Sequence, residues 1–241
     1  LAGGSSLSTT ITKADGGNYE KLEISDKPAE TSVTDTPDTT TLSLSATDSV
    51  AEGGSIVYTA TLSNAAGTPV TVTLSNGAVI TIAAGATSGT ATVAAPADDV
   101  YKDAGKVEAT ISTATGGNFE NLVPNPTPAV TTITDTVDNT GLTLTATGSV
   151  TEGGQITYTA TLTNPAQTPV NVTLSNGSVI TIKAGESTGS VVVDTPANDV
   201  YVNGSTVSTT ITSTTGGNFE SLVPSTTPAI TTITDSIDTT T

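Results

Sequence analysis

The sequence predicts an all-β protein made of tandem immunoglobulin-like β-sandwich repeats of about 100 residues. Three observations support this prediction. Val, Ile and Thr dominate the composition, apolar and polar residues alternate over short runs, and long motifs recur at a constant spacing. Alternation of this kind is the pattern of half-buried strands, and we find no helical periodicity of useful length.

An internal repeat predicts the domain organisation. The motif Gly116-Gly-Asn-Phe-Glu recurs from Gly216, 100 residues later and without a gap. About 60% of positions agree between residues 42–141 and 142–241. We therefore predict two complete sandwiches over these two ranges. Residues 1–41 match the end of a repeat and are predicted to be the C-terminal part of a preceding, variant copy.

Seven strands, A to G, are expected in each complete repeat. In the first repeat their ranges are 42–46, 56–62, 70–74, 79–82, 90–93, 107–112 and 129–134. Asn76-Gly77 indicates a tight hairpin between the third and fourth strands, because both residues tolerate positive φ. A loop rich in Gly and Pro is expected between the last two strands.

Residues 1–41 supply only strands F and G, which leaves no opposite sheet to cover them. Three explanations stay open: another copy of the chain completes the fold, the segment packs in some other way, or the fragment boundary is artificial. The predicted partners are therefore the neighbouring repeats of the same chain and, under the first explanation, a second copy.

The composition excludes several function classes. The chain has 23 acidic residues, six basic ones and a formal net charge of -17, with no His and no Cys. It can therefore form no Ser-His-Asp relay, no disulfide and no zinc site with nitrogen or sulfur ligands. Nucleic acid is a poor partner for so acidic a chain, and no apolar run is long enough to span a membrane.

The carboxylates gather at one pole of each predicted repeat. When the strands alternate in direction, the A–B turn, the E–F loop and the end of strand G lie together, facing the F–G loop of the next repeat. A hard cation bound by oxygen ligands, Ca²⁺, is the natural counterion. The candidate ligands are Asp35, Asp38, Glu52, Asp98, Asp99, Asp103, Asn118, Glu120, Asp135, Asp138, Glu152, Asp199, Asn218, Glu220, Asp235 and Asp238.

A plainer interpretation exists for each of these residues taken alone. Asp and Asn are favoured in turns because their side chains bond nearby backbone groups. The second repeat also carries Asn203 where the first has Asp103, so its site would have a lower charge. Tyr101 and Tyr201 follow the acidic loops. They could anchor these loops as a tyrosine corner does, but we favour a role in core packing.

Several motifs in a fixed order resemble the extender repeats of giant bacterial RTX-type adhesins. They are Thr-Val-Asp138-Asn-Thr, Ile-Asp238-Thr-Thr, Val-Thr-Glu152-Gly-Gly, Asn-Asp199-Val-Tyr and Thr-Gly-Gly-Asn-Phe-Glu. Large biofilm adhesins of pseudomonads and a marine ice-binding adhesin belong to this group. The resemblance implies immunoglobulin-like domains in long arrays on the bacterial surface, exported by a type I system and rigidified by Ca²⁺ near the linkers.

These observations predict a structural role, with no enzymatic activity. The repeats would be spacers that project an adhesive domain for surface attachment or biofilm formation, stiffened by Ca²⁺ at their joints. The alternative is an adhesin module that binds carbohydrate or protein, although such sites usually display exposed aromatic residues, and the chain has only seven aromatic residues. Paired carboxylates could serve a glycosidase, but no insertion interrupts the repeats to form a cleft.

Overall fold

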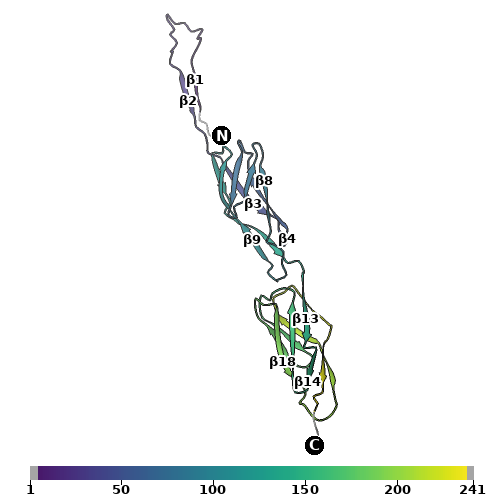
Figure 1. Ribbon diagram of the computed structural model, residues 1–241. Helices are drawn as coiled ribbons and strands as arrows, with labels where there is room; N and C mark the ends of the chain where they lie inside the picture. The colour runs from purple at the N-terminus through teal and green to yellow at the C-terminus, as the bar shows by residue number, and fades with distance from the viewer. Residues whose placement is uncertain (1–4, 238–241) are drawn as a thin grey trace. The chain divides into compact units, whose positions relative to one another are not determined.

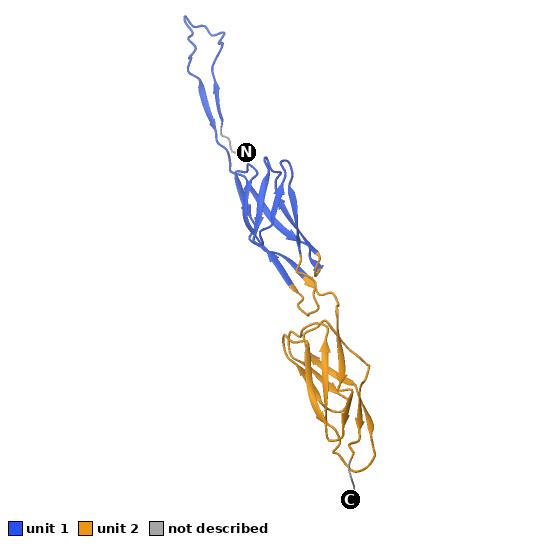
Figure 2. Ribbon diagram, viewed as in Figure 1, with its two compact units in different colours: residues 1–50, 55–94, 106–132 blue, residues 51–54, 95–105, 133–241 orange. Residues whose placement is uncertain are grey.

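The computed structural model describes residues 5–237, and every helix or strand in this range is a β-strand. The predicted all-β class is therefore confirmed. No helix in this range is long and apolar enough to cross a membrane. The chain forms two compact units (Figure 2). Residues 51–54 and 95–105 of the first repeat belong to unit 2 with all residues from 133 onwards, and the remaining residues form unit 1.

The first repeat contains ten strands in two layers (Figure 1). One layer is a four-stranded sheet in the order β11-β3-β5-β8. The other consists of β10-β6-β7 and β4-β12-β9, in which β9 and β10 are separated only by Thr110. The strands are β3 (Thr39–Ala46), β4 (Ser49–Ala51), β5 (Ser55–Leu62), β6 (Val70–Leu74), β7 (Val79–Ile82), β8 (Ser88–Ala94), β9 (Gly105–Ala109), β10 (Ile111–Gly116), β11 (Asn121–Pro124) and β12 (Ala129–Thr134).

The second repeat reproduces this topology, with sheets β18-β15-β13-β21, β14-β22-β19 and β17-β16-β20. Its strands are β13 (Asn139–Ala146), β14 (Ser149–Thr151), β15 (Gln155–Leu162), β16 (Val170–Leu174), β17 (Val179–Ile182), β18 (Thr188–Asp194), β19 (Ser205–Thr209), β20 (Ile211–Gly216), β21 (Ser221–Pro224) and β22 (Ala229–Thr234). The agreement follows from the sequence identity, because both repeats place apolar residues at the same strand positions.

The core of each sandwich comes from the alternation seen in the sequence. In β5, Ile56, Tyr58, Ala60 and Leu62 are buried, while the residues between them are exposed or half-buried. The same side chains are buried in β15, in a core cluster that extends to Phe219. The strands are thus held by burial of one face, and threonine occupies much of the solvated face.

The structure differs from the predicted seven strands in three ways. The first predicted strand continues beyond a break as β4, which joins the opposite sheet. The predicted sixth strand is divided into β9 and β10, with a register shift between Ile111 and Thr113. The expected loop between the last two strands contains β11, which pairs in parallel with β3. Such a short parallel pairing depends on closure of the whole sandwich and leaves no local pattern.

Residues 5–39 are all exposed to solvent. Within them β1 (Ser5–Thr9) pairs antiparallel with β2 (Ala29–Val33), from Ser5 opposite Val33 to Thr9 opposite Ala29. Two strands occur here, as the sequence suggested, but none of their side chains is buried. Completion of this ribbon by another copy stays a prediction, and so do the exact repeat boundaries.

Candidate metal centre

Glu52 lies directly after β4, in the turn that leads to β5. Its backbone N–H donates to Thr134 O at 3.1 Å, which ties the turn to the end of β12. Gly53 follows with φ of +67°, a conformation that glycine adopts at low cost. This local geometry turns the Glu52 side chain inward, where only 6% of the residue is exposed. A carboxylate so deeply buried requires a partner.

Three carboxylates meet at this point: Glu52, Asp135 and Glu220. One oxygen from each lies within 4.8 Å of the others. Each of the three also has a buried side-chain oxygen without a hydrogen-bond partner, namely Glu52 Oε2, Asp135 Oδ1 and Glu220 Oε1. We call these residues the three-carboxylate cluster. All three belong to unit 2, although Glu52 comes from the first repeat and Glu220 from the second.

The electrostatics of the cluster are unfavourable without a cation. A hydrogen bond with the Asp103 carboxyl, together with burial and the negative charges of Asp103, Asp135 and Asp99, raises the pKa of Glu52 to about 7. Like charges thus surround Glu52 on several sides. A divalent ion that prefers oxygen ligands would compensate these negative charges and coordinate the buried oxygens that lack hydrogen-bond partners. The residues present therefore fit Ca²⁺, and no softer ligand exists in a chain without His or Cys.

The surrounding loops hold the cluster in place. The second oxygen of Glu220, Oε2, accepts the backbone N–H of Asp138 at 2.7 Å. Asp99 Oδ1 accepts the N–H of Tyr101 at 2.7 Å, and Asp98 accepts the hydroxyl of Thr136. Asp98 and Asp99 are both exposed: the Asp99 contact is local to its turn, whereas Asp98 contacts a residue 38 positions further along the chain. Asp103 reaches Glu52, so it extends the acidic centre.

The corresponding pole of the second repeat has a related but less charged arrangement. Burial, followed by the charges of Asp235 and Asp199, raises the pKa of Glu152, whose Oε2 is buried without a hydrogen-bond partner. Asn203 replaces an aspartate here: its N–H donates to Asp235 at 3.0 Å and its amide to Asp199 at 3.1 Å. Asp238, also predicted as a ligand, lies outside the described residues.

The remaining predicted ligands lie at the start of the first repeat. Asp38 N–H donates to Glu120 Oε2 at 2.6 Å, which repeats the contact between Asp138 and Glu220 and lowers the pKa of Glu120. Asp35 is exposed between β2 and β3, and exposed Asn118 adopts φ of +53°. Asn218 has φ of +60° and donates through its amide to Gln167 at 2.7 Å. Both asparagines therefore serve turn geometry.

Sequence reasoning missed an aromatic contact beside the cluster. The ring of Tyr101 stacks on Phe219 with centroids 5.6 Å apart, and its hydroxyl donates to Pro165 O at 2.7 Å. The chain around Tyr101 pairs antiparallel with the chain around Phe219. Tyr101 therefore packs against the core cluster of the second repeat, and not against the core of its own repeat, and it fixes its loop there. Tyr201 is 72% exposed, so its predicted place in a core is wrong.

The fold and the cluster define a tandem β-sandwich repeat protein with a candidate cation site in unit 2. The family model described as LapA domain matches residues 38–136 and 138–236. The chain therefore belongs to the LapA domain family, with two tandem copies. This membership indicates an adhesin-associated repeat of the cell surface with a structural role. A comparison with curated proteins found no match.

Proposed function

We propose that this chain is a spacer segment of a bacterial cell-surface adhesin, and that Ca²⁺ rigidifies it where one repeat meets the next. One observation carries the proposal: three buried carboxylate oxygens without hydrogen-bond partners lie in a cluster that draws on both repeats. The role in biofilm or surface attachment, the extracellular location and export by a type I system complete the proposal on the basis of the adhesin resemblance.

Calcium suits the cluster better than other ions. Glu52, Asp135 and Glu220 offer three carboxylates, and Asp103 and Asp99 lie near enough to act on Glu52 electrostatically. Ca²⁺ accepts six to eight oxygens in flexible geometry, including backbone carbonyls and water, whereas Mg²⁺ demands a near-ideal octahedron. An irregular set of loop carboxylates therefore favours Ca²⁺ over Mg²⁺.

Bound Ca²⁺ would stiffen the joint through ligands from two repeats. Rotation about the short segment 135–138 would separate Glu220 from Glu52 and break the coordination. Without the ion, the same carboxylates repel one another and oppose close packing. The spacer would thus respond to the calcium concentration outside the cell.

Thermal unfolding and calorimetry test calcium binding directly. We expect the Tm to be higher in Ca²⁺ than in chelator. When free Ca²⁺ is 100 times the Kd, binding should raise the free energy of unfolding by about 2.7 kcal/mol. Glu220→Gln should lose most of this gain, whereas Glu120→Gln, the same change at the equivalent position of the first repeat, should keep the gain at the three-carboxylate cluster. An identical Tm in Ca²⁺ and in chelator would refute the metal site.

Small-angle scattering tests stiffening separately. We expect a longer and better-defined maximum dimension in Ca²⁺ than in chelator, and we expect Glu220→Gln to behave as the chelated protein does. If Ca²⁺ binds but the scattering does not change, the site is structural within its unit and the spacer mechanism is wrong.

A further inference from the structure

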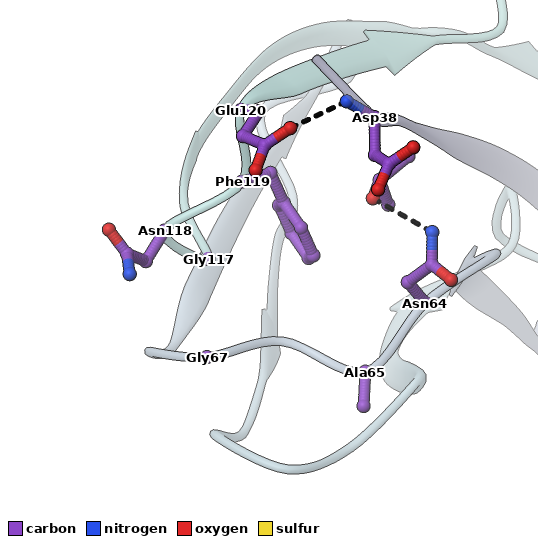
Figure 3. A pocket seen from close by; sticks show the side chains of 9 residues that line it. Asp38, Asn64, Ala65, Gly67, Gly117, Asn118, Phe119 and Glu120 are labelled. Atoms are coloured by element: carbon purple, nitrogen blue, oxygen red, sulfur yellow. Dashed lines mark hydrogen bonds between the residues drawn. The ribbon is translucent and has the colours of Figure 1, made fainter. Parts of the chain in front are cut away.

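A cavity of about 330 Å³ opens on the first repeat beside the ring of Phe119 (Figure 3). Phe119 forms one wall, Asn64 and Ala65 form another, and Gly67 and Glu120 contribute to its lining. We call this cavity the Phe119 socket. It lies wholly within unit 1.

Seven of the nine lining residues recur 100 residues later in the second repeat, and there Tyr101 occupies the corresponding place. Tyr101 stacks on Phe219 and donates to the main-chain oxygen of Pro165, the residue equivalent to Ala65. Phe219 is only 4% exposed, whereas Phe119 is half-buried. The first repeat therefore has a tyrosine-binding surface of the same design, and no tyrosine among residues 5–237 stacks on it.

The Phe119 socket shares two internal hydrogen bonds with its occupied counterpart. Asn64 donates to Thr40 Oγ1 at 3.0 Å, and the equivalent bond in the second repeat measures 3.1 Å. The Asp38–Glu120 contact likewise matches the one between Asp138 and Glu220. The socket is thus preformed, which reduces the entropic cost of binding.

Two substitutions separate the sockets, and neither blocks a tyrosine. Ala65 replaces Pro165 but keeps the main-chain oxygen that accepts the tyrosine hydroxyl. Gly67 replaces Gln167, whose side chain accepts the amide of Asn218.

The second repeat carries the matching tyrosine loop. Tyr201 is 72% exposed, and its neighbours Val200 and Val202 are 58% and 95% exposed. The N–H of Tyr201 donates to Asp199 Oδ1 at 2.8 Å, just as that of Tyr101 donates to Asp99 at 2.7 Å. The loop therefore shares this turn contact with the loop that presents Tyr101 to Phe219.

We propose that the Phe119 socket binds the tyrosine loop of a second copy of this chain, with Tyr201 of one copy on Phe119 of the other. The contact is heterologous, so it joins copies in series. Docking also brings Glu120 of one copy towards Glu152 and Asp235 of the other, the counterparts of Glu220, Glu52 and Asp135. Association should therefore require Ca²⁺, a requirement that rests on the proposed function.

Disulfide trapping tests the contact, since the chain has no cysteine of its own. In unit 2, Lys102 and Asn218 flank the antiparallel bridge between Tyr101 and Phe219, and Lys102 N–H donates to Asn218 O at 3.0 Å. Residues opposite each other in an antiparallel pair have Cα atoms about 4.5–5.5 Å apart, within disulfide range. Lys102→Cys with Asn218→Cys in one chain is therefore the internal control. The equivalent pair between copies is Val202→Cys in one chain and Asn118→Cys in another, mixed in Ca²⁺ under mild oxidation.

We expect a mixed disulfide dimer in Ca²⁺. Tyr201→Ala in the Val202→Cys chain should reduce it roughly ten-fold or more, because an aromatic anchor and its hydrogen bond are lost. Phe119→Ala in the other chain should have the same effect. Tyr201 is exposed, so its replacement leaves the fold intact.

Two results would overturn the proposal. One is an internal control that cross-links in Ca²⁺ while the mixture gives no mixed dimer. The other is a mixed dimer of equal yield with Tyr201→Ala. If Ca²⁺ still raises the Tm of the same samples, either result contradicts only the docking of two copies and not the proposed function. If Ca²⁺ no longer raises the Tm, the calcium site is what fails.

Discussion

Replacement of Tyr101 by alanine should destabilise unit 2 far more than the same replacement of Tyr201. Tyr101 loses a stack on Phe219 and a hydrogen bond to Pro165 O. An aromatic pair of this kind contributes about 1 kcal/mol beyond burial and a hydrogen bond about 1 kcal/mol. Because the partly buried ring is also lost, the free energy of unfolding should fall by at least about 2 kcal/mol. For a domain of this size that corresponds to about 8 °C in Tm.

Differential scanning calorimetry in Ca²⁺ measures this effect in the intact chain. Tyr201→Ala is the matched control and should shift the Tm little, because Tyr201 is exposed. Tyr101→Phe keeps the ring and should cost only the share of the hydroxyl, about 1 kcal/mol. Equal shifts for Tyr101→Ala and Tyr201→Ala would show that the stack on Phe219 stabilises nothing.

Three further predictions concern charge, backbone and core. In chelator, the Tm should fall as the pH rises from 5 to 8. The pKa of Glu52 is raised from 4.5 to about 7 in the folded protein, so the protonated side chain stabilises the fold at low pH. This stabilisation is lost as the pH rises through 7 and Glu52 ionises. A Tm that stays constant between pH 5 and pH 8 would contradict this prediction. Gly216→Ala should lower the free energy of unfolding in urea by about 3 kcal/mol, since the φ of Gly216 is +88° and a Cβ there would lie 2.0 Å from Pro169 O. Gly177 has a similar φ of +85° but faces open space, so Gly177→Ala should lower it by only about 1 kcal/mol. Tyr158→Phe should lower the free energy of unfolding by about 1–2 kcal/mol, because the buried hydroxyl of Thr209 loses its hydrogen-bond partner. Tyr58→Phe should lower it less, because the first repeat has Ala109 in place of this threonine.

Local patterns predicted the strands well because each strand buries one face. The alternation in β5 and β15 is visible in the sequence, and the same residues are buried in the structure. The parallel strand β11 escaped prediction because its four residues end in proline and find their partner through closure of the sandwich. The division of the first strand into β3 and β4 likewise depends on which sheet lies nearer after folding.

The acidic centre was only partly predictable. Alternating strand directions place Glu52 and Asp135 at one pole of the first repeat, facing Glu220 in the F–G loop of the second, and the structure brings these three together. The same argument could not separate them from Asp99, whose carboxylate caps the turn before Tyr101. Strand order does not determine side-chain geometry, so it cannot predict which carboxylate oxygen is buried without a hydrogen-bond partner.

The aromatic contact and the three-carboxylate cluster act in opposite directions on the same packing. The stack of Tyr101 on Phe219 favours close approach of the 95–105 loop to the second repeat at any calcium concentration. The proximity of Glu220 to Glu52 and Asp135 places like charges together across the same packing, and their repulsion opposes it when no cation is bound. Because the attraction is apolar and the repulsion is electrostatic, removal of Ca²⁺ should weaken the packing without abolishing it. Tyr101→Ala in chelator removes the attraction and keeps the repulsion, so this combination should give the most mobile joint of all the variants.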